Sequence, residues 1–136
     1  MKKILLIAIS ALFLLTGIEA RAQRIENGSH STIGYINNDG RIENSSHSTI
    51  GYFNRDRVEN SSHSTIGYIS NGRFENASHS TIGYIGSNGR VENASHSTIG
   101  YVNNCRVENA SHSTIGYYPG GLRPDWVAFY FFFINK

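Results

Sequence analysis

Six histidines are the residues of this chain whose type and regular spacing point most directly to chemistry. Each lies in the same segment, Asn-x-Ser-His-Ser, and the segments recur every 16 or 17 residues. Imidazole nitrogens are ligands for zinc, nickel and copper. If neighbouring copies stack as paired strands about 4.8 Å apart, two imidazoles could share an ion, whereas in a ring of splayed hairpins they would diverge. The alternative is a solvated loop histidine preserved by repeat duplication. The candidate metal ligands are His30, His47, His63, His79, His96 and His112.

Six tyrosines form a second row, one in each copy of Ser-Thr-Ile-Gly-Tyr. If their rings are exposed, they offer an amphipathic face for a glycan, a peptide or another envelope component. If they turn inward, they cover the core, and the sequence leaves both interpretations open. The candidate ligand face comprises Tyr35, Tyr52, Tyr68, Tyr84, Tyr101 and Tyr117.

Serine, histidine and glutamate in every copy are also the residue types of a hydrolytic triad. A catalytic site, however, needs different residues that converge once, and neighbours in sequence do not thereby reach triad geometry. The chain has no Gly-rich phosphate loop before a helix and no Cys-x-x-Cys pair. We therefore expect a protein that is not an enzyme and has no cofactor, unless the histidine row binds a divalent transition metal.

The first 22 residues have the pattern of a secretory signal peptide. Lys2 and Lys3 precede an almost wholly apolar run over residues 4–15, and Ala20-Arg21-Ala22 supplies a small-x-small cleavage site. The run is shorter than the ~20 residues of a transmembrane helix, so no membrane span is expected after cleavage. The predicted location is periplasmic or extracellular, with attachment to the cell surface as an open alternative.

Removal of this leader would leave a chain without net charge. The full sequence has 12 Lys and Arg against 10 Asp and Glu, and three of the former and one of the latter lie within residues 1–22, which leaves nine of each. Nucleic acid recognition depends on a basic surface, so a nucleic acid partner is not expected.

Residues 23–118 are six copies of a two-strand unit. Arg-Ile-Glu-Asn alternates polar and apolar residues as a half-buried strand does, and Thr-Ile-Gly-Tyr-Ile is rich in β-formers. The Asn-Ser-rich segment between them predicts one connection, and Asn-Gly or Asp-Gly pairs predict tight hairpin turns at the other. A bulge at Gly34-Tyr35 is expected to turn Ile33 and Ile36 to the core and to expose the tyrosine.

The array begins and ends with complementary half-repeats. Pairing of these halves would close an all-β ring of tandem hairpins and remove its exposed edges, while an open β-solenoid is the alternative. Residues 119–136 form a separate Phe-rich segment, with Pro124 at the start of a short helix. We expect its rings to pack on the repeat core and fix the register, the alternative being an exposed aromatic patch. Cys105, the only cysteine, falls at a turn tip, either by neutral drift or for a disulfide between molecules.

A signal peptide, repeats of the form I-G-Y-I-x-x-x-G-R-I-x-N-S and a terminal W-V-A-F-Y-F-F-F occur together in this chain. In this combination the sequence resembles the five-fold beta-flower proteins exported by Bacteroidetes, over nearly the whole mature length. The resemblance implies the fold and export. It implies no activity and no functional residue, since none is established for that family, and the Ser-His-Ser loops depart from the more varied loops expected there.

Overall fold

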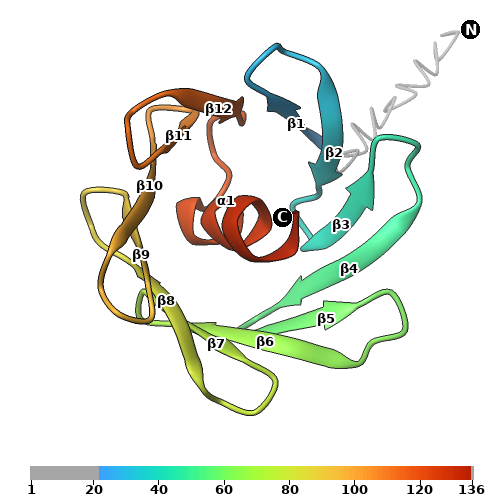
Figure 1. Ribbon diagram of the computed structural model, residues 1–136. Helices are drawn as coiled ribbons and strands as arrows, with labels where there is room; N and C mark the ends of the chain where they lie inside the picture. The colour runs from blue at the N-terminus through green and yellow to red at the C-terminus, as the bar shows by residue number, and fades with distance from the viewer. Residues whose placement is uncertain (1–21, 136) are drawn as a thin grey trace, which may run out of the picture.

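The computed structural model describes residues 22–135, in which twelve short strands close into one antiparallel ring (Figure 1). Predicted cleavage after Ala22 and the signal peptide assigned to residues 1–22 depend on residues outside this range. The strands are β1 (Gln23–Asn27), β2 (Thr32–Ile36), β3 (Arg41–Asn44), β4 (Thr49–Asn54), β5 (Arg57–Asn60), β6 (Thr65–Ser70), β7 (Arg73–Asn76), β8 (Thr81–Ile85), β9 (Arg90–Asn93), β10 (Thr98–Asn103), β11 (Arg106–Asn109) and β12 (Thr114–Tyr117). The all-β ring is therefore confirmed, and the open solenoid is not the architecture.

The two kinds of connection lie at opposite ends of the strands. The six Asn-x-Ser-His-Ser segments, here called the outer loops, project from the perimeter (Figure 1). The five inner turns lie nearer the centre and comprise residues 37–40, 55–56, 71–72, 86–89 and 104–105. Asn71 and Gly72 of one inner turn both have positive φ, of 51° and 74°, as expected of a tight Asn-Gly hairpin turn. At Asn104 and Cys105 the same geometry places the exposed cysteine in a left-handed conformation.

The period-two pattern fixes which side chains face the centre. In each Arg-x-Glu-Asn strand the middle apolar residue is fully buried, while the arginine on one side of it is exposed. The second strand of each copy buries its glycine and half-buries its tyrosine. The core residues at the first position are Ile25, Ile42, Val58, Phe74, Val91 and Val107.

A β-bulge is present in each copy, but one residue earlier than predicted. Gly34 pairs with Ile25 and Thr32 pairs with Glu26, which leaves Ile33 as the extra residue. Ile36 is fully buried, whereas Ile33 is only partly buried against the core. The buried position that we expected for Ile33 is taken by Gly34, where an added Cβ would lie 2.6 Å from the Glu43 carbonyl oxygen of the neighbouring strand and 2.5 Å from Tyr130 Oη.

The C-terminal segment fills the centre of the ring. Helix α1 (Pro124–Phe129) runs into a π-helical turn, η1 (Tyr130–Ile134), and α1 lies inside the circle of strands in Figure 1. Val127, Ala128, Phe129 and Tyr130 are at most 2 % exposed. The predicted packing of the Phe-rich segment on the repeat core is therefore confirmed. None of the helices among residues 22–135 has the length and apolar character needed to cross a membrane.

Each of five tail rings lies against the glycine of a different copy. A Cβ added to Gly34 would lie 2.5 Å from Tyr130 Oη, one on Gly67 would lie 2.9 Å from Phe129 Cζ, and one on Gly83 would lie 2.6 Å from Phe133 Cζ. Gly100 and Gly116 face Phe132 and Phe131 in the same manner. Gly51 faces no tail ring, and in that copy Phe53 stacks on Trp126 at 5.0 Å. In all six copies the added Cβ would also lie 2.4 to 2.7 Å from a backbone carbonyl oxygen of the neighbouring strand, so glycine is required at this position with or without a tail ring.

Candidate functional site

Each outer loop is folded by its own asparagine. Asn60 Oδ1 accepts hydrogen bonds from the backbone N–H of Ser62 and of Ser64, both at 3.0 Å, and the His63 N–H donates to the Asn60 carbonyl. The same three bonds occur in all six loops. Asparagine suits this position because its side-chain oxygen substitutes for a backbone acceptor in a turn.

The loop geometry places each histidine in a left-handed backbone conformation. The six φ values lie between 61° and 63°, a region that residues with a Cβ rarely adopt. From this position the imidazole folds back over the preceding strand. Nδ1 of His63 lies 3.0 Å from Glu59 Oε2, and the other five distances range from 2.9 to 3.3 Å. Since an ionised carboxylate only accepts hydrogen bonds, a neutral imidazole here carries its proton on Nδ1 and keeps the lone pair on Nε2.

Each of these glutamates lies between a histidine and an arginine. Glu59 Oε1 is 2.7 Å from Arg57 Nε, and the same ion pair recurs at every copy, including Arg90 with Glu92. The Glu59 side chain is only 3 % exposed, whereas that of His63 is 64 % exposed. A carboxylate so enclosed keeps its charge because both oxygens have donors.

The hydrogen bond from histidine is the main reason that four of these glutamates have lowered pKa values. In Glu59 the bond from His63 lowers the pKa below its ordinary value of 4.5, burial opposes it, and the Arg57 charge lowers it further. The pKa values of Glu75, Glu92 and Glu108 are lowered by the same causes in the same order.

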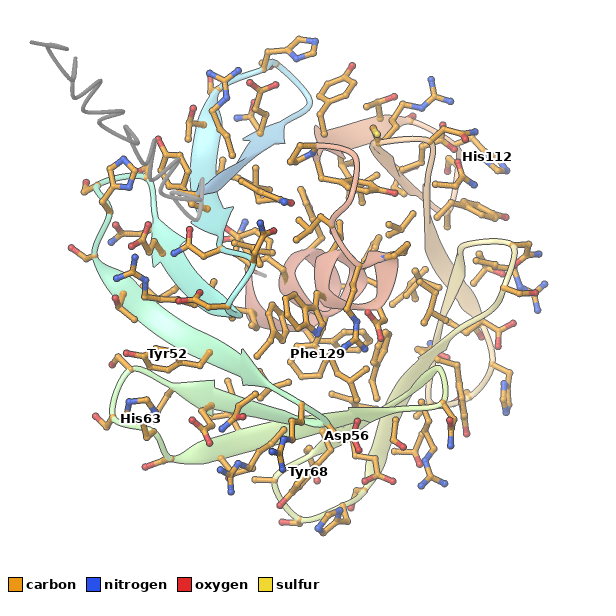
Figure 2. All side chains as sticks on the ribbon, turned by 180° about the vertical axis from the view of Figure 1, so that it is seen from behind. Tyr52, Asp56, His63, Tyr68, His112 and Phe129 are labelled. Atoms are coloured by element: carbon orange, nitrogen blue, oxygen red, sulfur yellow. The ribbon has the colours of Figure 1, made fainter. Side chains whose placement is uncertain are left out.

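Each imidazole also stacks on a tyrosine of the neighbouring strand. The register places Tyr52 opposite Glu59, and the ring of His63 lies 4.3 Å from that of Tyr52 at an interplanar angle of 15°. Figure 2 shows these two side chains together at the perimeter. The other stacked pairs are His30 with Tyr117, His47 with Tyr35, His79 with Tyr68, His96 with Tyr84 and His112 with Tyr101.

The result is six equivalent groups of arginine, glutamate, histidine and tyrosine, here called outer units. The sequence identified the histidine and tyrosine rows separately but did not show that they combine. A signal was available, since cross-strand pairing about the five inner turns places five tyrosines opposite a glutamate, and each of these glutamates is four residues before a histidine. The sixth tyrosine, Tyr117, lies opposite Glu26 where β1 pairs with β12. The tyrosines are half-buried, an intermediate between the exposed ligand face and the core cover that the sequence left open.

The outer units do not group the histidines with one another. Among residues 22–135, no three of histidine, cysteine, aspartate and glutamate are arranged to hold a metal ion. Each imidazole instead contacts its own glutamate and tyrosine, and His63 and His112 project from distant parts of the perimeter (Figure 2). Each outer unit can therefore offer a metal ion only one imidazole nitrogen, the outward Nε2.

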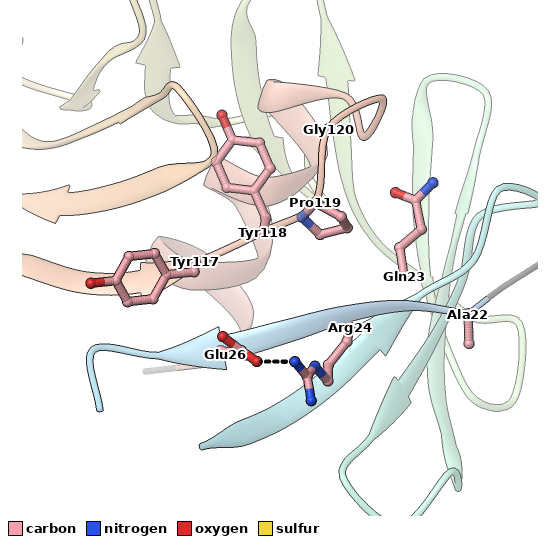
Figure 3. A pocket seen from close by; sticks show the side chains of 8 residues that line it. All are labelled: Ala22, Gln23, Arg24, Glu26, Tyr117, Tyr118, Pro119 and Gly120. Carbon is pink, nitrogen blue, oxygen red and sulfur yellow. Dashed lines mark ion pairs between the residues drawn. The ribbon is translucent and has the colours of Figure 1, made fainter. Parts of the chain in front are cut away.

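The ring closes at a seam that contains one outer unit and a cavity. Strands β1 and β12 pair only at Glu26 with Tyr117 and at Asn27 with Gly116, after which they separate. The resulting cavity of about 480 Å³ is lined by Arg24, Tyr118 and Pro119 among others (Figure 3). The His30–Tyr117 stack thus joins the two ends of the repeat array.

The comparisons with known proteins identify the family but give no ligand. A family model described as 5-fold beta-flower protein matches residues 22–135. No curated protein and no solved structure matches the chain significantly.

Proposed function

This chain belongs to the 5-fold beta-flower family, and on that basis we propose that it is an exported, non-enzymatic binding module of the cell envelope. The observation that carries the proposal is the sixfold repetition of one outer unit with nearly constant geometry. A catalyst gains nothing from six copies of an identical group, whereas a binding protein gains avidity for a repetitive ligand. A glycan or another envelope component with repeating chemistry is the ligand class that such a surface fits.

The arrangement around each imidazole supports a role other than hydrolysis. A hydrolytic triad needs a serine hydroxyl bonded to the nitrogen opposite the carboxylate. Within residues 22–135, no serine hydroxyl is hydrogen-bonded to an imidazole. Each imidazole contacts its glutamate through Nδ1, and the histidine side chain is exposed. The proposed contact surface is therefore the imidazole edge together with the tyrosine hydroxyl.

Co-sedimentation with insoluble envelope polysaccharides and peptidoglycan tests this proposal. We expect binding by the unaltered protein, and a loss of more than tenfold when all six histidines are changed to asparagine, which tolerates positive φ. Six Tyr→Phe changes, which remove only the hydroxyls, test the second contact group. Asp56→Asn in an inner turn is the matched control and should leave binding unchanged. Equal binding by all variants would reject the outer units as the ligand surface.

Metal binding by the same histidines is the second candidate function. It is favoured by one observation, the glutamate on each Nδ1, because metal-binding histidines usually donate the other ring N–H to a carboxylate or carbonyl. Calorimetric titration with zinc chloride at pH 7.5 and pH 5.5 tests it. We expect binding at the higher pH and its loss at the lower, since protonated imidazole is not a ligand. No heat at pH 7.5 would reject this candidate and leave the first intact.

A further inference from the structure

The outer units present a metal-ligating atom that is oriented before any metal arrives. The glutamate fixes the proton on Nδ1, and the tyrosine ring, 4.1 to 4.3 Å away, holds the imidazole plane. The histidine side chains are 59 to 65 % exposed. No protein group within residues 22–135 is hydrogen-bonded to an Nε2 atom, so this lone pair is directed to solvent.

One molecule does not complete the coordination of an ion. Zinc in proteins takes several nitrogen, sulfur or oxygen ligands, usually in a tetrahedron. The ring separates its six outer loops around the perimeter (Figure 1), and no three suitable side chains cluster in residues 22–135. An ion on one Nε2 can therefore gain further protein ligands from another molecule.

A second copy of this chain is the partner that the surface fits. Each outer unit combines one arginine with one glutamate, and residues 23–136 carry nine positive and nine negative side chains, so two copies approach without strong net repulsion. Because every copy has six equivalent units, any unit of one molecule can meet any unit of another. After one bridge forms, a second between the same molecules benefits from a raised effective concentration.

We propose that zinc or a similar divalent ion joins copies of this chain by bridging the Nε2 atoms of outer-loop histidines on two molecules. The inference rests on the metal-binding candidate above and adds the second copy as the source of the missing ligand. Six histidines shared in pairs give a saturated stoichiometry of three ions per chain.

Sedimentation velocity and calorimetry, made on the same zinc titration, test this proposal. The protein carries Cys105→Gly, which removes the thiol as a competing ligand and suits the positive φ of 62° there. We expect the sedimentation coefficient to rise with added zinc, to level at about three ions per chain as the pairing requires, and to return to its metal-free value with EDTA. A variant with His47, His79 and His112 changed to asparagine should level at half that stoichiometry.

The outcomes separate this inference from the function on which it rests. Zinc binding without a change in sedimentation would overturn the bridging proposal and leave metal binding standing. No binding by either measurement would overturn both. Zinc-dependent assembly that persists when all six histidines are asparagine would also overturn the proposal, because other groups would then bridge the molecules. Circular dichroism of each variant establishes that its ring is folded.

Discussion

Each outer-loop histidine adopts a backbone conformation that L-residues disfavour by about 1–2 kcal/mol. The Nδ1 bond to glutamate and the stacking on tyrosine offset this cost, since an aromatic pair contributes about 0.5–1.5 kcal/mol. The asparagine at the start of the loop provides a separate stabilisation through two hydrogen bonds to backbone N–H groups. Loop conformation and imidazole orientation are therefore supported by different residues, and each can be tested by itself.

Replacing the loop asparagine should destabilise the protein although it is on the surface. Asn60→Ala removes the acceptor for two backbone N–H groups, and we expect the free energy of unfolding to fall by about 1–2 kcal/mol. Ser61→Ala in the same loop is the control, because the equivalent residue is Ala77 in the next copy. Equal stability of the two variants in chemical denaturation would contradict the role assigned to Asn60.

The histidine also determines the acid titration of its glutamate. Because the His63 hydrogen bond is the largest cause of the lowered Glu59 pKa, His63→Asn should raise that pKa toward its ordinary value. A carboxyl whose folded pKa is lowered stabilises the protein above its unfolded pKa, and this stabilisation is lost as pH falls through the folded value. The variant should therefore lose less stability in that acid range than the unaltered protein.

Carbon NMR of the glutamate carboxyl groups measures this effect directly. In the His63→Asn variant, the titration midpoint of Glu59 should move upward while that of Glu75, which keeps His79, stays where it is. An unchanged Glu59 midpoint would show that Arg57 and Asn54, and not His63, lower its pKa.

At the scale of the elements, local pattern predicted the strands but not what the tail does to them. Arg-Ile-Glu-Asn and Asn-Gly carry their own periodicity and turn chemistry, so the strands and tight turns followed from the sequence. The bulge was predicted one residue late because the space at Gly34 is limited by residues outside its own copy, the Glu43 carbonyl oxygen of the next strand and Tyr130, which is almost one hundred positions away. Contacts between residues so far apart in the chain cannot be predicted from the sequence of a single repeat.

The glycine row and the tail rings form matched pairs whose coupling can be measured. A Cβ at Gly67 would lie 2.9 Å from Phe129 Cζ and 2.6 Å from the Glu75 carbonyl oxygen, so Gly67→Ala should destabilise the protein. Phe129 is 2 % exposed, and Phe129→Ala should cost about 3–5 kcal/mol. In the double variant the new methyl group occupies part of the space left by the ring. The loss of unfolding free energy should therefore be smaller than the sum of the losses in the two single variants.

Gly51→Ala provides the control for this cycle. That glycine meets the Glu59 carbonyl oxygen at 2.5 Å but no tail ring, so its loss of stability should be additive with that of Phe129→Ala. Denaturation of the single and double variants measures both couplings. Equal coupling at Gly67 and Gly51 would argue against a specific match between ring and glycine.

At the scale of the whole molecule, ring closure was predictable because the array begins and ends in complementary halves. The outer unit was not predictable in full, because its four side chains come from two strands and a loop and their combination depends on register. Closure and the outer units are linked at the seam, where β1 and β12 share only two residue pairs. There His30 from one end of the array stacks on Tyr117 from the other, so the sixth unit exists only in a closed ring.

The proton position on the six histidines tests most directly whether a closed ring holds six equivalent imidazoles with Nε2 directed outward. Long-range proton–nitrogen NMR of the side chains at pH 7.5 reports which ring nitrogen carries hydrogen. We expect the Nδ1–H form at all six positions, with His30 at the seam matching the other five. Protonation at Nε2, or a His30 signal unlike the rest, would contradict it.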